Sequence, residues 1–300
     1  STTSVPCNSD SKYPFTKFII IGSGRRVQQD VLPVLNSIGF DKSEIRIYAS
    51  RIKTIFVRDT LYDVFNFNDI DEIGDDSIVY VAVPPSAIFK VVSQIILLNA
   101  SVKIIIDTPI NDISLVNNFK NNNIWVAEDA AYLGYFLKNT INLNVFNVMI
   151  LHKSAVVYHG IAFIESLLLN SYISFTVFGS HLMFCKKGIA IIIGKRDYEN
   201  GEIWLNFKKL IFPNLNYSQI KLVGGLTDFD NVSYRFLELK RIGLEQMIQT
   251  ILQNKTTDLI NLTVAHEQFL KSQKINKYSF KKTLKYIVKF FVPNTLLNKF

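Results

Sequence analysis

Residues 16–27, T-K-F-I-I-I-G-S-G-R-R-V, decide the fold of this chain. The apolar run predicts a buried strand over residues 16–21, and apolar residues at helical spacing predict a helix over residues 25–38. The turn between them matches the first two glycines of the pattern G-x-G-x-x-G, and Val27 stands in place of the third. A glycine turn that leaves a strand and opens a helix can receive a pyrophosphate on its backbone N–H groups. We expect a nucleotide site at Gly22, Ser23, Gly24, Arg25 and Arg26; a turn without a ligand is the alternative.

The rest of the first half repeats this alternation of strand and helix. Helices are predicted over residues 86–98 and 114–121, between short apolar runs. This order is typical of a parallel sheet with crossover helices. We therefore expect a Rossmann dinucleotide-binding domain over residues 15–127, after a flexible N-terminus of residues 1–14. Its further strands are expected at residues 44–49, 64–67, 77–83, 102–106 and 124–127.

The second half has longer alternating runs joined by short turns, which predict neighbouring antiparallel strands. We expect an α+β domain over residues 128–270 with a large, mainly antiparallel open sheet. The strands are expected at residues 144–157, 174–184, 188–193, 203–207 and 219–223, and the helices at 237–253 and 257–271. An open sheet can pair with a second copy of itself, so we expect a homodimer or homotetramer.

The end of the second predicted strand indicates which dinucleotide binds. An acidic side chain there bonds the ribose hydroxyls of NAD and repels a 2′-phosphate. The chain has Ser50 and Arg51 instead, and the planar guanidinium of arginine suits a phosphate. These residues favour NADP over NAD, with an ordinary surface loop as the alternative.

Four segments in order resemble the Gfo/Idh/MocA oxidoreductases: residues 22–35 (GSGRRVQQDVLPVL), 81–86 (VAVPPS), 104–110 (IIIDTPI) and 126–133 (VAEDAAYL). The resemblance implies a Rossmann domain joined to a C-terminal α/β domain with a large open sheet. It further implies hydride transfer between a nicotinamide and a carbohydrate, such as an activated or nucleotide-linked sugar. By the same resemblance, the cofactor also contacts Pro84, Asp107, Thr108 and Pro109.

The sequence departs from the family at its catalytic positions. Thr108 stands where the family has the lysine of a Glu-Lys-Pro motif, and the family's Asp and His align with His159 and Phe163. We expect His159 to be the proton donor or acceptor because its charge changes near neutral pH, with Tyr158 and Lys153 in reserve.

These departures leave two other functions open. One is the reduction of an imine or a conjugated double bond on the same fold, and the other is a non-catalytic dinucleotide sensor or scaffold. A pocket around His159 that is filled by Phe163 and Tyr132 would favour the non-catalytic function.

The net charge of +8 lies entirely in residues 271–300, which hold eight lysines and no acidic residue. The rest of the chain is neutral, which argues against nucleic-acid binding. Residues 277–292 predict a basic amphipathic helix that packs on the body or a partner subunit, or else lies on an anionic membrane.

Several other classes lack support in the sequence. Cys7 and Cys185 are the only cysteines and have no metal-ligand spacing, so we expect neither a disulfide framework nor a metal site. No hydrolase or kinase motif is present. The N-terminus has no apolar signal core, and no apolar run is long enough to span a membrane, so we expect a cytoplasmic protein, with contact at the inner face of the membrane as an alternative.

Overall fold

The structure is a computed structural model that divides into two compact units. Unit 1 takes in the described residues up to Glu128 together with Leu244–Glu267, and unit 2 takes in those of Asp129–Gly243 and those after Glu267. The structure describes residues 17–140, 147–151, 157–168, 172–177, 180–185, 188–193, 202–206, 208–211, 221–223 and 236–273.

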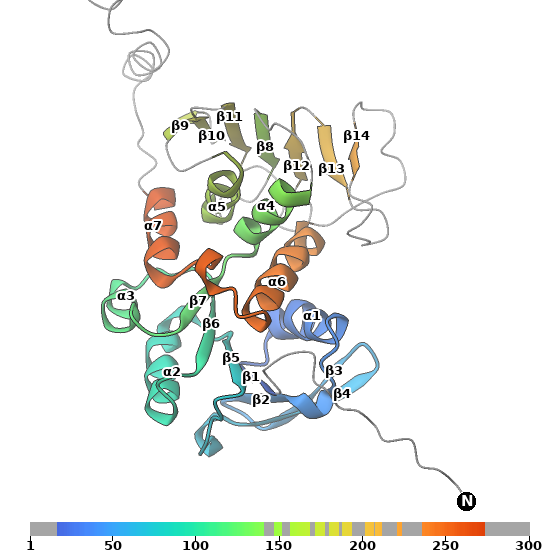
Figure 1. Ribbon diagram of the computed structural model, residues 1–300, viewed down its shortest axis with the longest axis vertical. Coiled ribbons are helices and arrows are strands. Elements are labelled where there is room, and N and C mark those ends of the chain that lie inside the picture. The colour runs from blue at the N-terminus through green and yellow to red at the C-terminus, as the bar shows by residue number, and fades with distance from the viewer. Residues whose placement is uncertain are drawn as a thin grey trace, which may run out of the picture. The chain divides into compact units, whose positions relative to one another are not determined.

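Unit 1 is built on a seven-stranded sheet with the order β3-β4-β2-β1-β5-β6-β7. All neighbouring strands are parallel except the antiparallel pair β3 and β4 at one edge. Figure 1 shows α1 on one side of this sheet and α2 and α3 on the other. The strands are β1 Lys17–Ile21, β2 Ile45–Ala49, β3 Lys53–Val57, β4 Thr60–Asn66, β5 Ser77–Val81, β6 Lys103–Asp107 and β7 Ile124–Ala127; the helices are α1 Leu32–Ser37, α2 Pro85–Leu98 and α3 Ile113–Phe119.

The central strands of unit 1 carry its core. All five residues of β5 are buried, as are four of five in β1, because helices cover both faces of a parallel sheet. This confirms the Rossmann fold expected from the glycine turn and the strand–helix alternation. The connection after β1 opens with a π-helical turn, Val27–Val31, before α1 continues it, where the sequence predicted one regular helix.

The edge hairpin of unit 1 was only half predicted. Strand β3 was missed because Lys53, Thr54 and Phe56 are exposed, so the segment lacks a buried apolar run. Arg58 and Asp59 connect it to β4 with positive φ angles of 46° and 64°, as in the two-residue turns that suit the twist of a hairpin.

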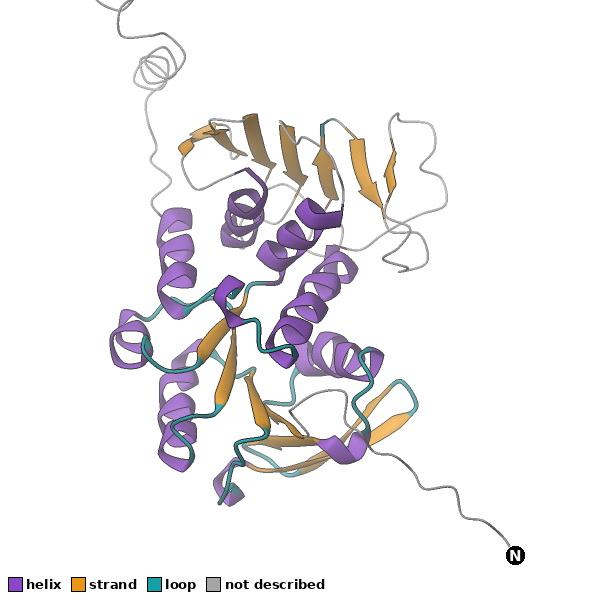
Figure 2. Cartoon of the chain, viewed as in Figure 1, coloured by secondary structure: helices purple, strands orange, loops and turns teal. Residues whose placement is uncertain are grey.

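Unit 2 holds a second seven-stranded sheet with the order β14-β13-β12-β8-β11-β10-β9. Only the central pair β8 and β11 is parallel among the pairs of this sheet that the structure describes. Helices α4 and α5 pack together beside this sheet (Figures 1 and 2). The bounds are α4 Asp129–Thr140, β8 Asn147–Leu151, α5 Val157–Leu168, β9 Tyr172–Val177, β10 Ser180–Cys185, β11 Gly188–Ile193, β12 Glu202–Leu205, β13 Lys208–Ile211 and β14 Lys221–Val223.

The mainly antiparallel open sheet is confirmed, with two errors in its strands. Among the described residues of the run expected over residues 144–157, those of β8 are strand, whereas the last residue of the run begins α5. The run expected over residues 174–184 is two strands, β9 and β10, paired as a hairpin.

The last two helices of the described chain are each divided between the units, since the boundaries after Gly243 and Glu267 fall within them. Helix α6 spans Phe236–Leu252 and α7 spans Leu262–Gln273, where the sequence predicted 237–253 and 257–271. The segment between them joins the sheet of unit 1, since Asn261 forms a β-bridge with Trp125 and the Val126 N–H donates to Ile260 O at 2.8 Å. The sequence had assigned this segment to the second domain.

Three expectations lie outside the described residues: Lys153, the N-terminus of residues 1–14 and the basic segment 277–292. Among the helices that the structure does describe, none combines the length and the apolarity needed to cross a membrane.

Candidate functional site

Gly22 is required by the backbone where β1 ends. Its φ angle is +119°, and a Cβ at this position would overlap the carbonyl oxygen of Ala82. Its N–H donates to Tyr48 O at 2.7 Å, while the Ala82 N–H donates to Ile21 O at 2.8 Å. The glycine therefore lets the carboxyl ends of β1, β2 and β5 lie close together.

Gly24 is different, because no neighbouring protein atom requires a glycine at this position. Its φ angle lies outside the left-handed region, and a Cβ there would meet no heavy atom within 4 Å. The helical turn begins here, with the Gln28 N–H donating to Gly24 O at 3.2 Å and the Gln28 side chain donating to Ser23 O at 2.8 Å. The space beside Gly24 is therefore open for a ligand to approach the backbone.

A pocket of about 550 Å³ lies beside this turn, wholly within unit 1. It opens at the carboxyl ends of β1, β2 and β5, where β2 and β5 flank β1 and the strand order reverses. Parallel α/β sheets bind nucleotides at such a switch point. The lining residues are Ile21, Gly22, Ser23, Gly24, Ala49, Ser50, Asn66, Phe67, Asn68, Ala82, Val83, Pro84, Ala87, Lys90, Val91 and Gln94.

The lining contains both apolar and polar residues, and it includes a lysine but no carboxylate. Ser50 lines the pocket as expected, whereas Arg51 follows it in the chain, is exposed and is not part of the lining. Lys90 and Asn66 were missed by the sequence analysis. For Lys90 a signal existed, since it lies with Ala87, Val91 and Gln94 on one face of the helix that follows VAVPPS.

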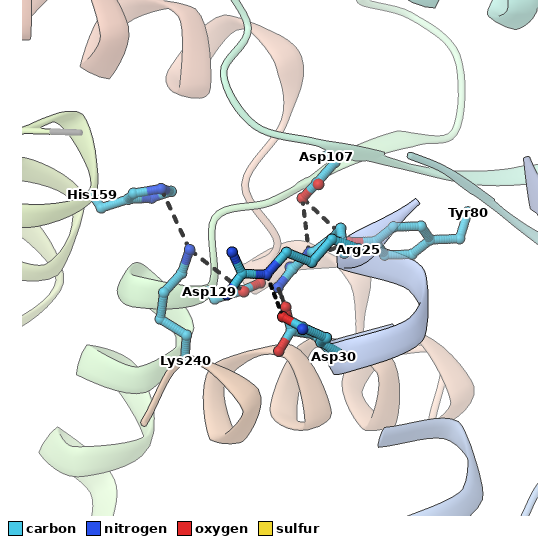
Figure 3. Close-up of polar contacts among 9 residues, drawn as sticks. Arg25, Asp30, Tyr80, Asp107, Asp129, His159 and Lys240 are labelled. Carbon is cyan, nitrogen blue, oxygen red and sulfur yellow. Dashed lines mark hydrogen bonds and ion pairs between the residues drawn. The ribbon is translucent and has the colours of Figure 1, made fainter. Parts of the chain in front are cut away.

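The side chain of Arg26 holds a group of polar residues together, here called the Arg26 cluster: Arg26, Asp30, Tyr80 and Asp107. The Arg26 guanidinium lies 3.1 Å from Asp30 Oδ2 and 3.3 Å from Asp107 Oδ1. It also donates to the Tyr80 hydroxyl at 3.3 Å. That hydroxyl donates to Asp107 Oδ1 at 3.3 Å, and Figure 3 labels Tyr80 and Asp107. One guanidinium thus compensates two carboxylates, and Asp107, at the end of β6, is held from inside the protein.

The remaining predicted residues of unit 1 lie near these carboxyl ends. Thr108 and Pro109 are half-buried after β6, and Pro84 is exposed and lines the pocket. Arg25 is exposed and its Nε donates to Gln29 Oε1 at 2.6 Å. Arg25, Arg26 and the Asp107–Pro109 segment do not line the described pocket.

His159 lies in the first turn of α5 in unit 2 and is buried, with 3% of its surface exposed. Its Nε2 is 3.4 Å from Lys240 Nζ, which is in turn 4.0 Å from Asp129 Oδ2. Figure 3 shows the lysine side chain between the histidine and the carboxylate. The neighbouring ring of Tyr158 lies 4.2 Å from the His159 ring.

The sequence analysis made the state of a pocket around His159 the feature that separates a catalytic from a non-catalytic protein. Phe163 and Tyr132, which were expected to fill such a pocket in a non-catalytic protein, are 1% and 4% exposed. Lys240 and Asp129 were missed by the sequence analysis. Lys240 gave a signal, since it falls on the apolar face of α6 with Leu244, Met247, Ile248 and Ile251.

No protein-family model and no curated protein matches this sequence. Solved structures do match. An oxidoreductase from Thermotoga maritima is 12% identical, with 87% of this chain and 95% of that chain covered and a TM-score of 0.55. The chain has the fold of the Gfo/Idh/MocA oxidoreductases. This confirms the resemblance found in the four segments at the level of the fold.

Two further neighbours of this fold act on named compounds. Levoglucosan dehydrogenase, determined with NADH and levoglucosan, is 11% identical over 86% of this chain and 95% of its own, with a TM-score of 0.52. The apo scyllo-inositol dehydrogenase from Lactobacillus casei is 13% identical over 87% and 95%, with a TM-score of 0.50.

Proposed function

We propose that this protein is a nicotinamide-dependent oxidoreductase that acts on a carbohydrate. The observation that carries the proposal is the pocket at the switch point of unit 1, beside a glycine that the protein itself does not need. A Cβ on Gly24 would fill space that a pyrophosphate requires, so the residues present fit a dinucleotide. The backbone of Gly22, Ser23 and Gly24 would hold its phosphates.

A bound nicotinamide supplies the hydride chemistry, and the protein supplies binding, orientation and a path for the proton. We propose NADP as the cofactor in preference to NAD. The absence of a carboxylate among the lining residues and the presence of Ser50 and Lys90 support this choice, and Arg51 lies next to Ser50 in the chain. A 2′-phosphate suits a lysine and an arginine and would be repelled by the acidic residue that NAD sites use.

The test is a fluorescence titration with NADPH and NADH of the wild type, Arg51→Ala and Lys90→Met. The exposed Lys120, which does not line the pocket, provides the control Lys120→Ala. Because a hydrogen bond to a charged group contributes about 1.5–3 kcal/mol, Arg51→Ala and Lys90→Met should each bind NADPH roughly 10- to 100-fold more weakly. NADH binding should not change. Equal binding of NADPH and NADH by the wild type would contradict the NADP assignment, and binding of neither would contradict the oxidoreductase.

For the substrate we propose an activated or nucleotide-linked sugar. The levoglucosan dehydrogenase and the scyllo-inositol dehydrogenase among the fold neighbours support the carbohydrate class. We propose His159 as the group that exchanges the proton, with Tyr158 and Lys153 in reserve. Oxidation of NADPH in the presence of a panel of keto-sugars, imines and conjugated enones would identify the class of substrate, with His159→Gln as the control.

We further propose a homodimer or homotetramer formed through the open sheet of unit 2. Light scattering after size-exclusion chromatography measures its mass, and a monomer at micromolar concentration would contradict it. Peripheral membrane contact through residues 277–292 is the corresponding proposal for the basic segment. Sedimentation with anionic vesicles, and with neutral ones as control, tests it.

A second candidate is a non-catalytic protein that binds the dinucleotide without turning it over. The burial of His159, Phe163 and Tyr132 favours it, as does the threonine at position 108. Tight binding of NADPH with no oxidation by any member of the panel would support this candidate. Turnover that is lost in His159→Gln would exclude it.

A further inference from the structure

Three side chains from separate elements of unit 2 meet out of contact with water. His159 comes from α5, Lys240 from α6 and Asp129 from the start of α4. The side chains of Lys240 and Asp129 are 7% and 0% exposed, and His159 is 3% exposed. The two basic nitrogens, Lys240 Nζ and His159 Nε2, lie 3.4 Å apart, and the carboxylate lies 4.0 Å from the lysine (Figure 3).

This geometry limits how many protons the two bases can hold. A protonated lysine and a doubly protonated histidine would face each other with like charges in a medium that screens them poorly. The carboxylate of Asp129 compensates one positive charge, and Tyr158, which packs on the histidine ring, is neutral at ordinary pH. Glu128 precedes Asp129 in the chain and is itself buried. The stable arrangement is therefore a lysine ammonium that donates to an unprotonated Nε2, while the histidine carries its proton on Nδ1.

We propose that Lys240 and His159 form a proton-sharing pair that delivers one net proton, and that Lys240 is the positioning residue that keeps His159 ready to donate. In the reduction of a carbonyl or imine, the proton on Nδ1 would pass to the substrate atom while Lys240 passes one from Nζ to Nε2. The step leaves a neutral imidazole protonated on Nε2 beside a neutral lysine amine, and the resting pair returns when Nδ1 takes up a proton from water and Nε2 gives its proton back to Lys240. This step rests on the proposed reductase, and it supplies the proton path that Thr108 cannot.

The direct test is the protonation state of His159, read from the ¹⁵N shifts of the ring nitrogens in the protein without cofactor. The chain has four histidines, and loss of one signal set in His159→Gln assigns the residue. His266, whose Nδ1 lies 2.9 Å from the carbonyl of Ile110, gives an internal reference for a ring protonated on Nδ1. We expect His159 to be neutral and protonated on Nδ1 at pH 7, and still neutral at pH 6. A proton on Nε2 at pH 7, or a doubly protonated ring at pH 6, would overturn the proposal.

Variants of the lysine separate a relay from a structural ion pair. In Lys240→Met, Nε2 loses its donor and should become protonated, whereas Lys271→Met should leave the His159 signals unchanged. Lys271 is the matched control because it is paired with Glu165 at 2.6 Å in the same unit. If Lys240→Met does not fold, the measurement on the wild type still decides.

Turnover adds a second readout. Lys240→Arg keeps the charge beside Asp129, but a guanidinium does not release its proton. If the lysine is only structural, Lys240→Arg restores the kcat that Lys240→Met loses to the wild-type value. If the lysine is a relay, the kcat of Lys240→Arg stays at least tenfold below wild type while the KM for NADPH is unchanged. Restored kcat would therefore overturn the relay. Absence of turnover in the wild type, with the expected ring protonation, would instead show that the proposed reductase fails and that the proton-sharing pair stands.

Discussion

The two glycines of the turn after β1 make opposite predictions for the same substitution. Gly22→Ala forces an alanine to a φ angle of +119°, which costs about 1–3 kcal/mol. The new Cβ would also overlap the carbonyl oxygen of Ala82 and push β1 and β5 apart. This weakens the hydrogen bonds from Gly22 to Tyr48 (2.7 Å) and from Ala82 to Ile21 (2.8 Å), each contributing about 1 kcal/mol. We therefore expect Gly22→Ala to lower the free energy of unfolding by about 3–5 kcal/mol.

Gly24→Ala is the matched control, because its Cβ meets no protein atom within 4 Å. We expect its stability to stay within about 0.5 kcal/mol of wild type. Its affinity for NADPH should fall at least tenfold, since the methyl group takes the space of the phosphate. Stability would be measured by urea unfolding in a Trp204→Phe background, where Trp125 of β7 reports on unit 1. Equal loss of stability in both variants, or unchanged NADPH affinity in Gly24→Ala, would refute the assignment of one glycine to the fold and the other to the ligand.

Three further substitutions test the packing and the electrostatics by urea unfolding. Gly243→Ala should destabilise unit 2 by about 1–3 kcal/mol, because the new Cβ would overlap the carbonyl oxygen of Asp129. This overlap outweighs the gain from the higher helix propensity of alanine. An unchanged free energy of unfolding would contradict the close contact. Tyr80→Phe should cost about 1–3 kcal/mol, since the Arg26 cluster loses a buried hydroxyl that both donates and accepts. The hydrogen bonds that Asp112 accepts from the Ser114 hydroxyl and N–H lower the pKa of that carboxyl below 3.8. A carboxyl whose pKa is lower in the folded state stabilises the fold at pH values above its unfolded pKa, and this stabilisation is lost as the pH falls through its folded pKa. The loss of unfolding free energy in Asp112→Ala should therefore be smaller at pH 3 than at pH 7. A loss that grows in acid would contradict this.

Much of unit 1 could be predicted from the sequence because its signals are local. A buried strand of a parallel sheet is a continuous apolar run, and the glycine turn is a short motif with a backbone requirement that Gly22 meets within a few residues. The hairpin β3–β4 was only partly predicted, because its strands expose alternate side chains and have no continuous apolar run. In unit 2, strands β9 and β10 were read as one because only residues 178 and 179 separate them in the sequence, which interrupts the apolar pattern only briefly.

The sequence by itself determined the Rossmann unit, the glycine turn and the residues of that turn, since each depends on neighbours in the chain. Only the tertiary structure decided which side chains complete the sites. Lys90 reaches the pocket from a helix that follows a different strand, and Arg26 meets Asp107 across the sheet. Lys240 meets His159 across 81 positions of sequence, and no local pattern encodes a contact at that separation. Such contacts depend on how helices pack, and burial then determines their chemistry, because a charge out of reach of water takes its properties from the few groups beside it.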